Sequence, residues 1–286
     1  MTVTEKKIHS KEGFTLIELL VVISIIAILL SILLPSLGLA REQGKSVYCA
    51  SNLRQMAFAV SSYNLDNDNY FPIAQWSDGQ KSYCWDFVTY TESGVDVVES
   101  GLLWQGEAID KVNQCPSYKG SNNWGTIGTY TGYNYNTSYI GHGQGESTTN
   151  KYTGTKIPHP VWPGMYEIVM PAKVTKLRSP GDCALFGDGH YSGGVNKFMR
   201  SPDTWDGDRS SSLKSAGTQG YRHNDKTNVA WADGHAGSEN KYYTDSYDKV
   251  YNIPLDSIKD QLDKYNENAK VKIGFLSNDN DAYDLK

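Results

Sequence analysis

The chain has 286 residues, enough for one large domain or two small ones. Lys and Arg total 27 against 32 for Asp and Glu, and the net charge of -5 leaves no basic surplus to neutralise phosphates. We therefore expect no nucleic-acid partner. Aromatic residues make up 12% of the chain, which excludes an intrinsically disordered protein.

An apolar segment follows a polar N-terminal stretch, residues 1–13, that contains three lysines. Between Phe14 and Leu34 the only charged side chain is Glu18. As a helix this segment would be about 31 Å long, enough to cross a bilayer core of about 30 Å. Because the lysines precede it, the positive-inside tendency predicts a cytoplasmic N-terminus and an extracytoplasmic remainder.

Two general interpretations compete for this segment. A secretory signal peptide would use the small-x-small site Gly38-Leu39-Ala40, but the apolar run is longer than is usual for such peptides. An ordinary signal anchor would leave Glu18 unexplained, since a carboxylate within a membrane span costs roughly 2.5–3.5 kcal/mol. A residue of this kind usually has a partner or a function.

The sequence Gly13-Phe14-Thr15-Leu16-Ile17-Glu18-Leu19-Leu20 resembles the processing and methylation signal of type IV prepilins and type II secretion pseudopilins. The resemblance implies that a prepilin peptidase cuts between Gly13 and Phe14, removes the leader 1–13 and methylates the new amine of Phe14. It also implies that Glu18 is neutralised by the Phe14 ammonium of a neighbouring subunit, and that Pro35 is the helix-loosening proline that many members carry.

The implied protein is a structural subunit of a type IV pilus-like or secretion pseudopilus filament, and no catalysis is expected. Its partners would be other copies of itself or related pilins, the prepilin peptidase, and inner-membrane lipid before assembly. The protein would begin as a single-pass inner-membrane protein and end in an extracytoplasmic, cell-surface filament.

Helical periodicity continues after Pro35, and we expect an amphipathic continuation over residues 36–66. One stripe with spacings of 4, 3, 4 and 3 holds Cys49, Leu53, Met56, Val60 and Tyr63. Three polar residues are predicted to face solvent: Asn52, Gln55 and Ser62. Because a proline in a helix interior costs about 3 kcal/mol, a bend or local melting is expected at Pro35 and Gly38.

The remaining residues, 67–286, are predicted to form an extracytoplasmic, β-rich globular head. Short runs bounded by turn residues predict strands at Lys81–Thr89, Thr129–Asn136, Cys183–Gly187 and Thr227–Ala232. A hairpin is expected over Val229–Ala236, a short helix over Leu255–Tyr265 and a polar tail over Ser277–Lys286. A long surface loop is expected over Trp124–Tyr139 and Gly141–Gly145. The fold class is α+β, a long N-terminal helix packed on a mainly antiparallel head with long loops.

A second resemblance lies near the C-terminus, where His223 is followed after nine residues by Asp233-Gly234. This signature, with the N-L-R-Q-M-A segment that begins at Asn52, resembles large prepilin-like proteins that occur in many copies in some environmental bacteria.

Four cysteines lie on the side of the membrane expected to be exported: Cys49, Cys84, Cys115 and Cys183. An even number outside the cytoplasm allows two disulfides in three connectivities. Cys49 lies on the inward helical stripe, so a buried free thiol is an alternative there. The chain has no CxxC pair, and tetrahedral zinc coordination has little support.

The triplet Asp-Gly-His occurs twice, at residues 188–190 and 233–235. It offers weak candidates for metal ligands, which are Asp188, His190, Asp233 and His235, with His223 upstream of the second triplet. The simpler interpretation is that both Asp-Gly pairs form turns. The loops Asp66–Asn69 and Asp203–Asp208 offer oxygen ligands for calcium, which some pseudopilins hold in the head, but neither has EF-hand spacing. We expect no cofactor.

The alternative functional class is a membrane-anchored binding module, with the head gripping polysaccharide or calcium. Exposed Trp and Tyr side chains would stack on sugar rings. Most of the aromatic residues are expected to lie in the core instead.

Overall fold

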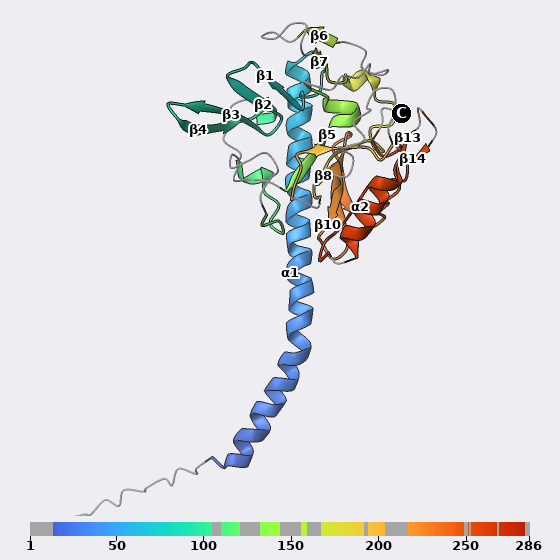
Figure 1. Ribbon diagram of the computed structural model, residues 1–286. Coiled ribbons are helices and arrows are strands. Elements are labelled where there is room, and N and C mark those ends of the chain that lie inside the picture. The colour runs from blue at the N-terminus through green and yellow to red at the C-terminus, as the bar shows by residue number, and fades with distance from the viewer. Residues whose placement is uncertain are drawn as a thin grey trace, which may run out of the picture. The chain divides into compact units, whose positions relative to one another are not determined.

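The computed structural model describes residues 14–104, 110–120, 132–143, 156–158, 167–191, 194–203, 217–248, 251, 253–267 and 269–283. The chain divides into two compact units, Met1–Glu42 and Gln43–Lys286. Helix α1, Leu16–Asp66, contributes residues to both units (Figure 1).

Helix α1 is 51 residues long, as the periodicity predicted. Its backbone stays α-helical through Pro35, so the local melting expected there is not found. The hydroxyl groups of Ser31 and Ser36 donate hydrogen bonds to carbonyls three residues earlier, at 2.7 and 2.9 Å. By length and composition the helix is able to span a membrane, a test that signal sequences near an N-terminus also pass.

The second half of α1 packs into the core of the second unit. Cys49, Leu53, Met56 and Val60 are buried, as the stripe predicted. The prediction for Asn52 was wrong, because this side chain is buried and its amide donates to the Gln114 carbonyl and to the Tyr133 hydroxyl, both at 3.2 Å. Burial of this amide costs little free energy, because its two hydrogen bonds replace those that it would make with water.

A five-stranded sheet forms the centre of the second unit, in the order β12-β11-β8-β5-β9. Its strands are β5 (Tyr133–Asn136), β8 (Ala184–Asp188), β9 (Phe198–Met199), β11 (Thr227–Trp231) and β12 (Ala236–Glu239). All pairs are antiparallel except β5 with β9. Every residue of β5 and β8 is buried, which indicates that both faces of the sheet are covered there.

The predicted hairpin is confirmed, since β11 and β12 pair and Gly234 at its tip has φ +92°. The predicted strand Lys81–Thr89 is instead two strands, because the chain reverses between them. A four-stranded antiparallel sheet contains β1 (Gln75–Ser77), β2 (Lys81–Cys84), β3 (Phe87–Glu92) and β4 (Val95–Ser100). In Figure 1 this sheet lies on the opposite side of α1 from β8 and β10.

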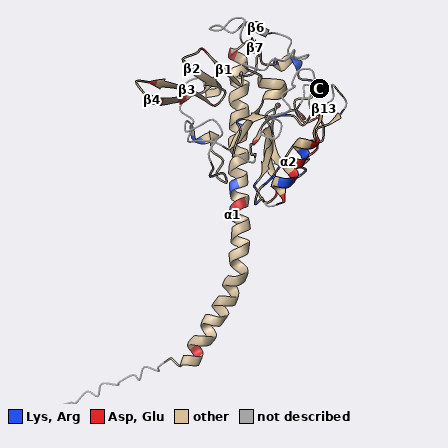
Figure 2. Ribbon diagram, in the orientation of Figure 1, with Lys and Arg blue, Asp and Glu red and all other residues tan. Residues whose placement is uncertain are grey.

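Smaller elements complete the fold. Helix α2, Asp256–Asn266, confirms the short helix predicted there and carries alternating charges (Figure 2). The three two-stranded pairs are β6 (Lys156–Pro158) with β7 (Glu167–Val169), β10 (Gln219–Tyr221) with β15 (Lys272–Gly274), and β13 (Tyr247–Asp248) with β14 (Ile253–Pro254).

Two segments expected on the surface are part of the core. Residues 132–143, the described part of the expected loop and of the stretch after it, are buried and form β5 and a π-helical turn, Thr137–Gly141. The expected polar tail is also wrong in its described part, because Tyr283 is fully buried and its hydroxyl accepts a hydrogen bond from the Leu276 amide at 2.8 Å. The rings of Trp85, Tyr135 and Phe186 pack together at centroid distances of 5.0–5.8 Å. These rings confirm that much of the aromatic content is core.

Candidate functional site

Thr15 and Glu18 close the N-terminus of α1. The Thr15 backbone N–H and hydroxyl each donate to Glu18 Oε2 at 2.8 Å, and the Glu18 N–H donates to the Thr15 hydroxyl oxygen at 3.2 Å. This reciprocal pattern is a capping box, for which the Thr-x-x-Glu spacing is the local sequence signal. Both bonds to the carboxylate end on Oε2, so among the described residues Oε1 stays available to another molecule. The resemblance pointed only to pairing between subunits.

The expected processing site adjoins this cap. Phe14 precedes Thr15, and 73% of its surface is exposed. Gly13 and the rest of the expected leader lie outside the described residues. Glu18 is the acidic residue of the first helical turn, and Figure 2 shows almost no other charge along the first half of α1.

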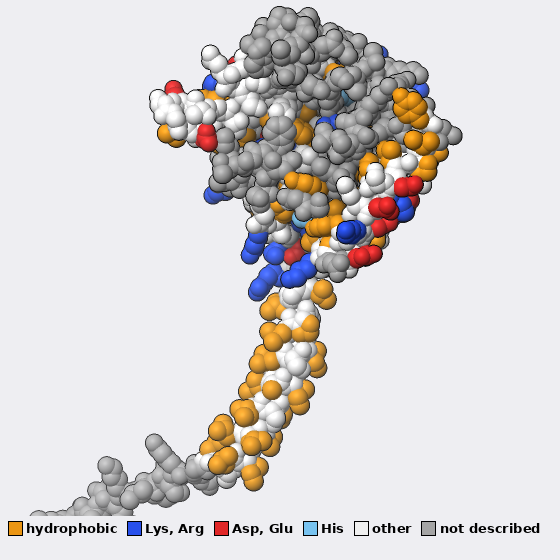
Figure 3. All heavy atoms as spheres, in the orientation of Figure 1, with side chains coloured by type: hydrophobic (Ala, Val, Ile, Leu, Met, Phe, Trp, Pro, Cys, Tyr) orange, Lys and Arg blue, Asp and Glu red, His pale blue; other side chains and the backbone are white. Residues whose placement is uncertain are grey.

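The first half of α1 exposes apolar side chains along the whole face seen in Figure 3. Leu16, Ile17, Leu19, Val21 and Val22 are all between 45% and 80% exposed. At 3.6 residues per turn they point in different directions around the helix. An apolar surface of this extent requires lipid or protein to cover it.

A second site lies inside the head, where the structure brings together two of the five weak metal candidates. Asp188 and His223 lie with Cys49 and Cys115, and one ligand atom from each residue lies within 4.8 Å of the others. All four side chains are buried. Cys49 comes from α1, Cys115 from the segment after a short helical turn, Asp188 from the end of β8 and His223 from the turn after β10.

Specific distances define this four-residue cluster. The Sγ atoms of Cys49 and Cys115 are 2.8 Å apart, and His223 Nε2 lies 3.7 Å from Cys115 Sγ and 3.3 Å from Asp188 Oδ2. The two cysteines were not expected to join metal candidates, because no CxxC pair marks them. The four residues are far apart in the chain and come together only in the tertiary structure.

Polar and charged neighbours favour the ionised forms of Cys115 and His223, but not of Cys49. Arg222 Nη2 lies 3.5 Å from Asp188 Oδ1. Burial opposes ionisation of Cys115, but the hydrogen bond from Cys49 and the charge of Arg222 lower the pKa of this thiol to about 6. Burial also opposes the charge on His223, yet hydrogen bonds with Asp188 and Cys115 raise its pKa to about 10. Burial raises the pKa of Cys49 well above its ordinary value.

The other candidates lie elsewhere. His190 Nε2 lies 3.1 Å from the Tyr265 hydroxyl, and Asp233 pairs with His235 at 2.6 Å on the exposed hairpin tip. Asp233-Gly234 therefore forms a turn, as the simpler interpretation held. Asp188-Gly189 does not, because Asp188 is the last residue of a buried strand.

The two remaining cysteines, Cys84 and Cys183, are also buried, and neither is part of a disulfide. Cys183 donates to the Tyr283 carbonyl at 3.3 Å. Disulfide pairing stays a prediction for these residues, and Cys49 with Cys115 is the pair that the fold brings into contact.

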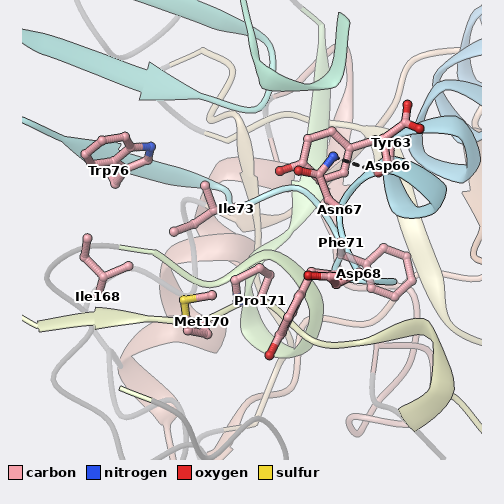
Figure 4. A pocket seen from close by; sticks show the side chains of 11 residues that line it. Tyr63, Asp66, Asn67, Asp68, Phe71, Ile73, Trp76, Ile168, Met170 and Pro171 are labelled. Carbon is pink, nitrogen blue, oxygen red and sulfur yellow. Dashed lines mark hydrogen bonds between the residues drawn. The ribbon is translucent and has the colours of Figure 1, made fainter. Parts of the chain in front are cut away.

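The first expected calcium loop borders a cavity of about 600 Å³ at the end of α1 (Figure 4). Asp66 and Asp68 line it beside apolar groups that include Trp76 and Met170. Asp68 and Asn69 have φ of +50° and +61°, which is the left-handed backbone of a helix end. In the second loop Asp203 is described and buried, and residues 204–208 lie outside the described part.

Comparison with known proteins identifies the N-terminal segment. Residues 8–34 carry the prokaryotic N-terminal methylation motif. The chain is 40% identical over 62 residues to the type IV wide pilus major component PilA4 of Thermus thermophilus, which covers 22% of this chain and 47% of that protein. It is 34% identical over 64 residues to the competence protein ComGC of Halalkalibacterium halodurans, and this match covers 22% of this chain and 63% of that protein.

The chain thus spans about half the length of these curated relatives, and the matches cover less than a quarter of its own residues. No solved structure matches the chain. The likeness confirms the resemblance drawn from the motif around Gly13 and Phe14.

Proposed function

We propose that the protein is a structural subunit of a type IV pilus-like or type II secretion pseudopilus filament, assembled through the first half of α1. The observation that carries the proposal is the methylation motif over residues 8–34, joined to an apolar helix in which Glu18 is the only charged residue before Arg41. The relatives are a pilus component and a competence protein, which agrees with a structural role.

Assembly follows from the exposed apolar surface of α1. Before assembly, lipid of the inner membrane would cover it, with the lysine-containing N-terminus in the cytoplasm. In the filament the same side chains would pack against helices of other copies or of related pilins. Burial of apolar surface contributes about 0.025 kcal/mol per Å², so this segment supplies the main attraction between subunits.

Glu18 would set the register of that packing. A carboxylate without a partner is strongly disfavoured in an apolar bundle, whereas one paired with the Phe14 ammonium of a neighbour is tolerated. The exposed outer face of the second half of α1, with Phe58 62% and Leu65 82% exposed, offers further apolar contact.

The test is the mature N-terminus, read by mass spectrometry on the protein from its native host. We expect N-methyl-Phe14, produced by a prepilin peptidase that cuts after Gly13. Gly13→Val should block cleavage because its side chain would fill space that glycine leaves open to the peptidase, and Gly38→Val serves as the matched control. A mature chain that begins at Arg41 and depends on Gly38 would show a secreted protein and refute the proposal.

A second candidate is a binding module anchored by the same helix. The cavity beside Asp66, Asp68 and Trp76 favours it, because aromatic and carboxylate groups together suit a sugar or a calcium ion. Glycan-array binding by the full chain in detergent, lost in Trp76→Ala and kept in Tyr251→Ala, would support it. Tyr251 is 67% exposed and does not line this cavity. Filaments that form normally from a Trp76→Ala chain would favour the first function.

A further inference from the structure

We propose that Cys49, Cys115, Asp188 and His223 bind one zinc ion inside the head. The four side chains come from four separate segments and converge within 4.8 Å in a buried position. This site is independent of filament assembly, since none of its residues belongs to the first half of α1.

The donor set has the chemistry that zinc prefers. Two thiolates, one imidazole and one carboxylate are all established zinc ligands, and soft sulfur donors disfavour calcium and magnesium. Four protein donors leave no open position, which is typical of a structural rather than a catalytic zinc site.

Two separations within the cluster match tetrahedral zinc coordination. Zinc bonds of about 2.3 Å to sulfur and about 2.0–2.2 Å to nitrogen and oxygen would hold the ligand atoms roughly 3.3–3.8 Å apart. The separations of 3.7 Å from His223 Nε2 to Cys115 Sγ and 3.3 Å from Nε2 to Asp188 Oδ2 fall in this range. The two sulfur atoms, at 2.8 Å, would need to separate by about 1 Å to reach it.

Partners of the ligands hold them in place. Ser117 Oγ lies 3.4 Å from His223 Nδ1, the ring nitrogen that faces away from the cluster. The Tyr133 hydroxyl donates to Cys49 Sγ at 3.1 Å, and the Asn228 N–H donates to Asp188 Oδ2 at 2.7 Å. Ligands of metal sites are usually oriented by outer hydrogen bonds of this kind.

The charges also balance. Two thiolates, one carboxylate and a divalent cation leave one net negative charge, and Arg222 beside Asp188 supplies the opposing charge. Asp188 Oδ1 is buried and accepts no hydrogen bond from the described residues.

The competing chemistry is a disulfide between Cys49 and Cys115, which an oxidising compartment would favour. A disulfide would leave the buried Asp188 and His223 without a function in the cluster. Zinc uses all four groups, and it would tie α1 to the central sheet. His223, the histidine of the C-terminal signature, thereby gains a defined role.

The first experiment uses the native full chain, purified in detergent without reductant or chelator. We expect one zinc per chain by elemental analysis, and four free thiols after denaturation with chelator. Removal of zinc should lower the Tm, zinc should restore it, and Co²⁺ in its place should give thiolate-to-cobalt absorption. A Cys49–Cys115 disulfide in the mass spectrum, or no uptake of zinc by the reduced chain, would overturn the proposal.

Matched variants locate the site. Cys115→Ser and His223→Gln should each lower zinc affinity at least tenfold, whereas Cys183→Ser and His190→Gln should retain the full equivalent. Zinc uptake that is unchanged in both ligand variants would overturn the assignment. If a ligand variant fails to fold, the loss and recovery of Tm in the native chain still decides the question.

Discussion

The Nζ atom of Lys197 lies 2.7 Å from Asp86 Oδ2, and both side chains are buried. Lys197 directly precedes β9 of the central sheet, and Asp86 directly precedes β3 of the four-stranded sheet. The indole N–H of Trp85 also donates to the Lys197 carbonyl at 3.2 Å. This buried ion pair therefore links the two sheets of the head.

Removal of one member of this pair should destabilise the protein strongly, because the other charge would stay buried without a partner. We expect Lys197→Met to lower the free energy of unfolding by about 3–5 kcal/mol, measured by denaturant titration of the full chain. The double variant Lys197→Met with Asp86→Asn should recover part of this loss.

The control is the pair of Lys81 and Glu99, which are 3.6 Å apart and have side chains 35% and 49% exposed. Lys81→Met should cost at most about 1 kcal/mol, since solvent screens such pairs. Equal costs for Lys81→Met and Lys197→Met would contradict the role of burial.

The two roles of Glu18 can be separated by substitution. Glu18→Gln keeps an acceptor for the capping box with Thr15 but removes the charge proposed to pair with Phe14 of a neighbour. We expect this variant to be processed normally and to form few filaments, or filaments with altered stagger, in electron micrographs. Thr15→Ala should do the reverse: it should weaken the start of the helix but keep the charge of Glu18, so that filaments still form. Normal filaments from Glu18→Gln would show that the charge does not set the register.

The hairpin tip at Gly234 depends on backbone conformation alone. Its φ of +92° is unfavourable for a residue with a side chain, while an added Cβ would meet no atom closer than 4.0 Å. Gly234→Ala should therefore destabilise the protein by about 1–2 kcal/mol in denaturant unfolding. Gly237→Ala, in β12 with open space around its Cβ, is the matched control and should change stability by less than about 0.5 kcal/mol. Similar effects of both substitutions would refute the backbone argument.

The C-terminal segment should be needed for stability, because Tyr283 is fully buried in the main core. Tyr283→Ala removes a large core side chain, and we expect a loss of about 3–5 kcal/mol. Tyr283→Phe keeps the ring but leaves the Leu276 N–H without its acceptor, for a loss of about 1–3 kcal/mol. Thermal unfolding of both variants measures the difference, and a stable Tyr283→Ala chain would mean that the segment is dispensable.

Features encoded by neighbouring residues were accessible from the sequence. The motif from Gly13 to Leu20, the length of α1 and the buried stripe from Cys49 to Val60 all depend on local order or helical periodicity. The hairpin at Asp233-Gly234 and helix α2 were found for the same reason, since turn residues and 3.6-residue spacing act over a few positions.

The predictions from the sequence were wrong where segments distant in the chain meet in the structure. Asn52 reads as a solvent-facing polar residue on a helical wheel, yet Gln114 and Tyr133 provide its partners inside the core. Residues 132–143 and Tyr283 have loop-like composition, but they are buried because other segments cover them.

The sequence by itself determined how this chain begins: a processing motif, an apolar helix and one carboxylate, all within some forty residues. Only the tertiary structure decided that Cys49, Cys115, Asp188 and His223 form one buried cluster. The physical reason is that ligand geometry depends on how α1 and β8 pack against each other. No periodicity along the chain records the distances between these side chains, since even the two nearest in sequence, Asp188 and His223, are 35 residues apart.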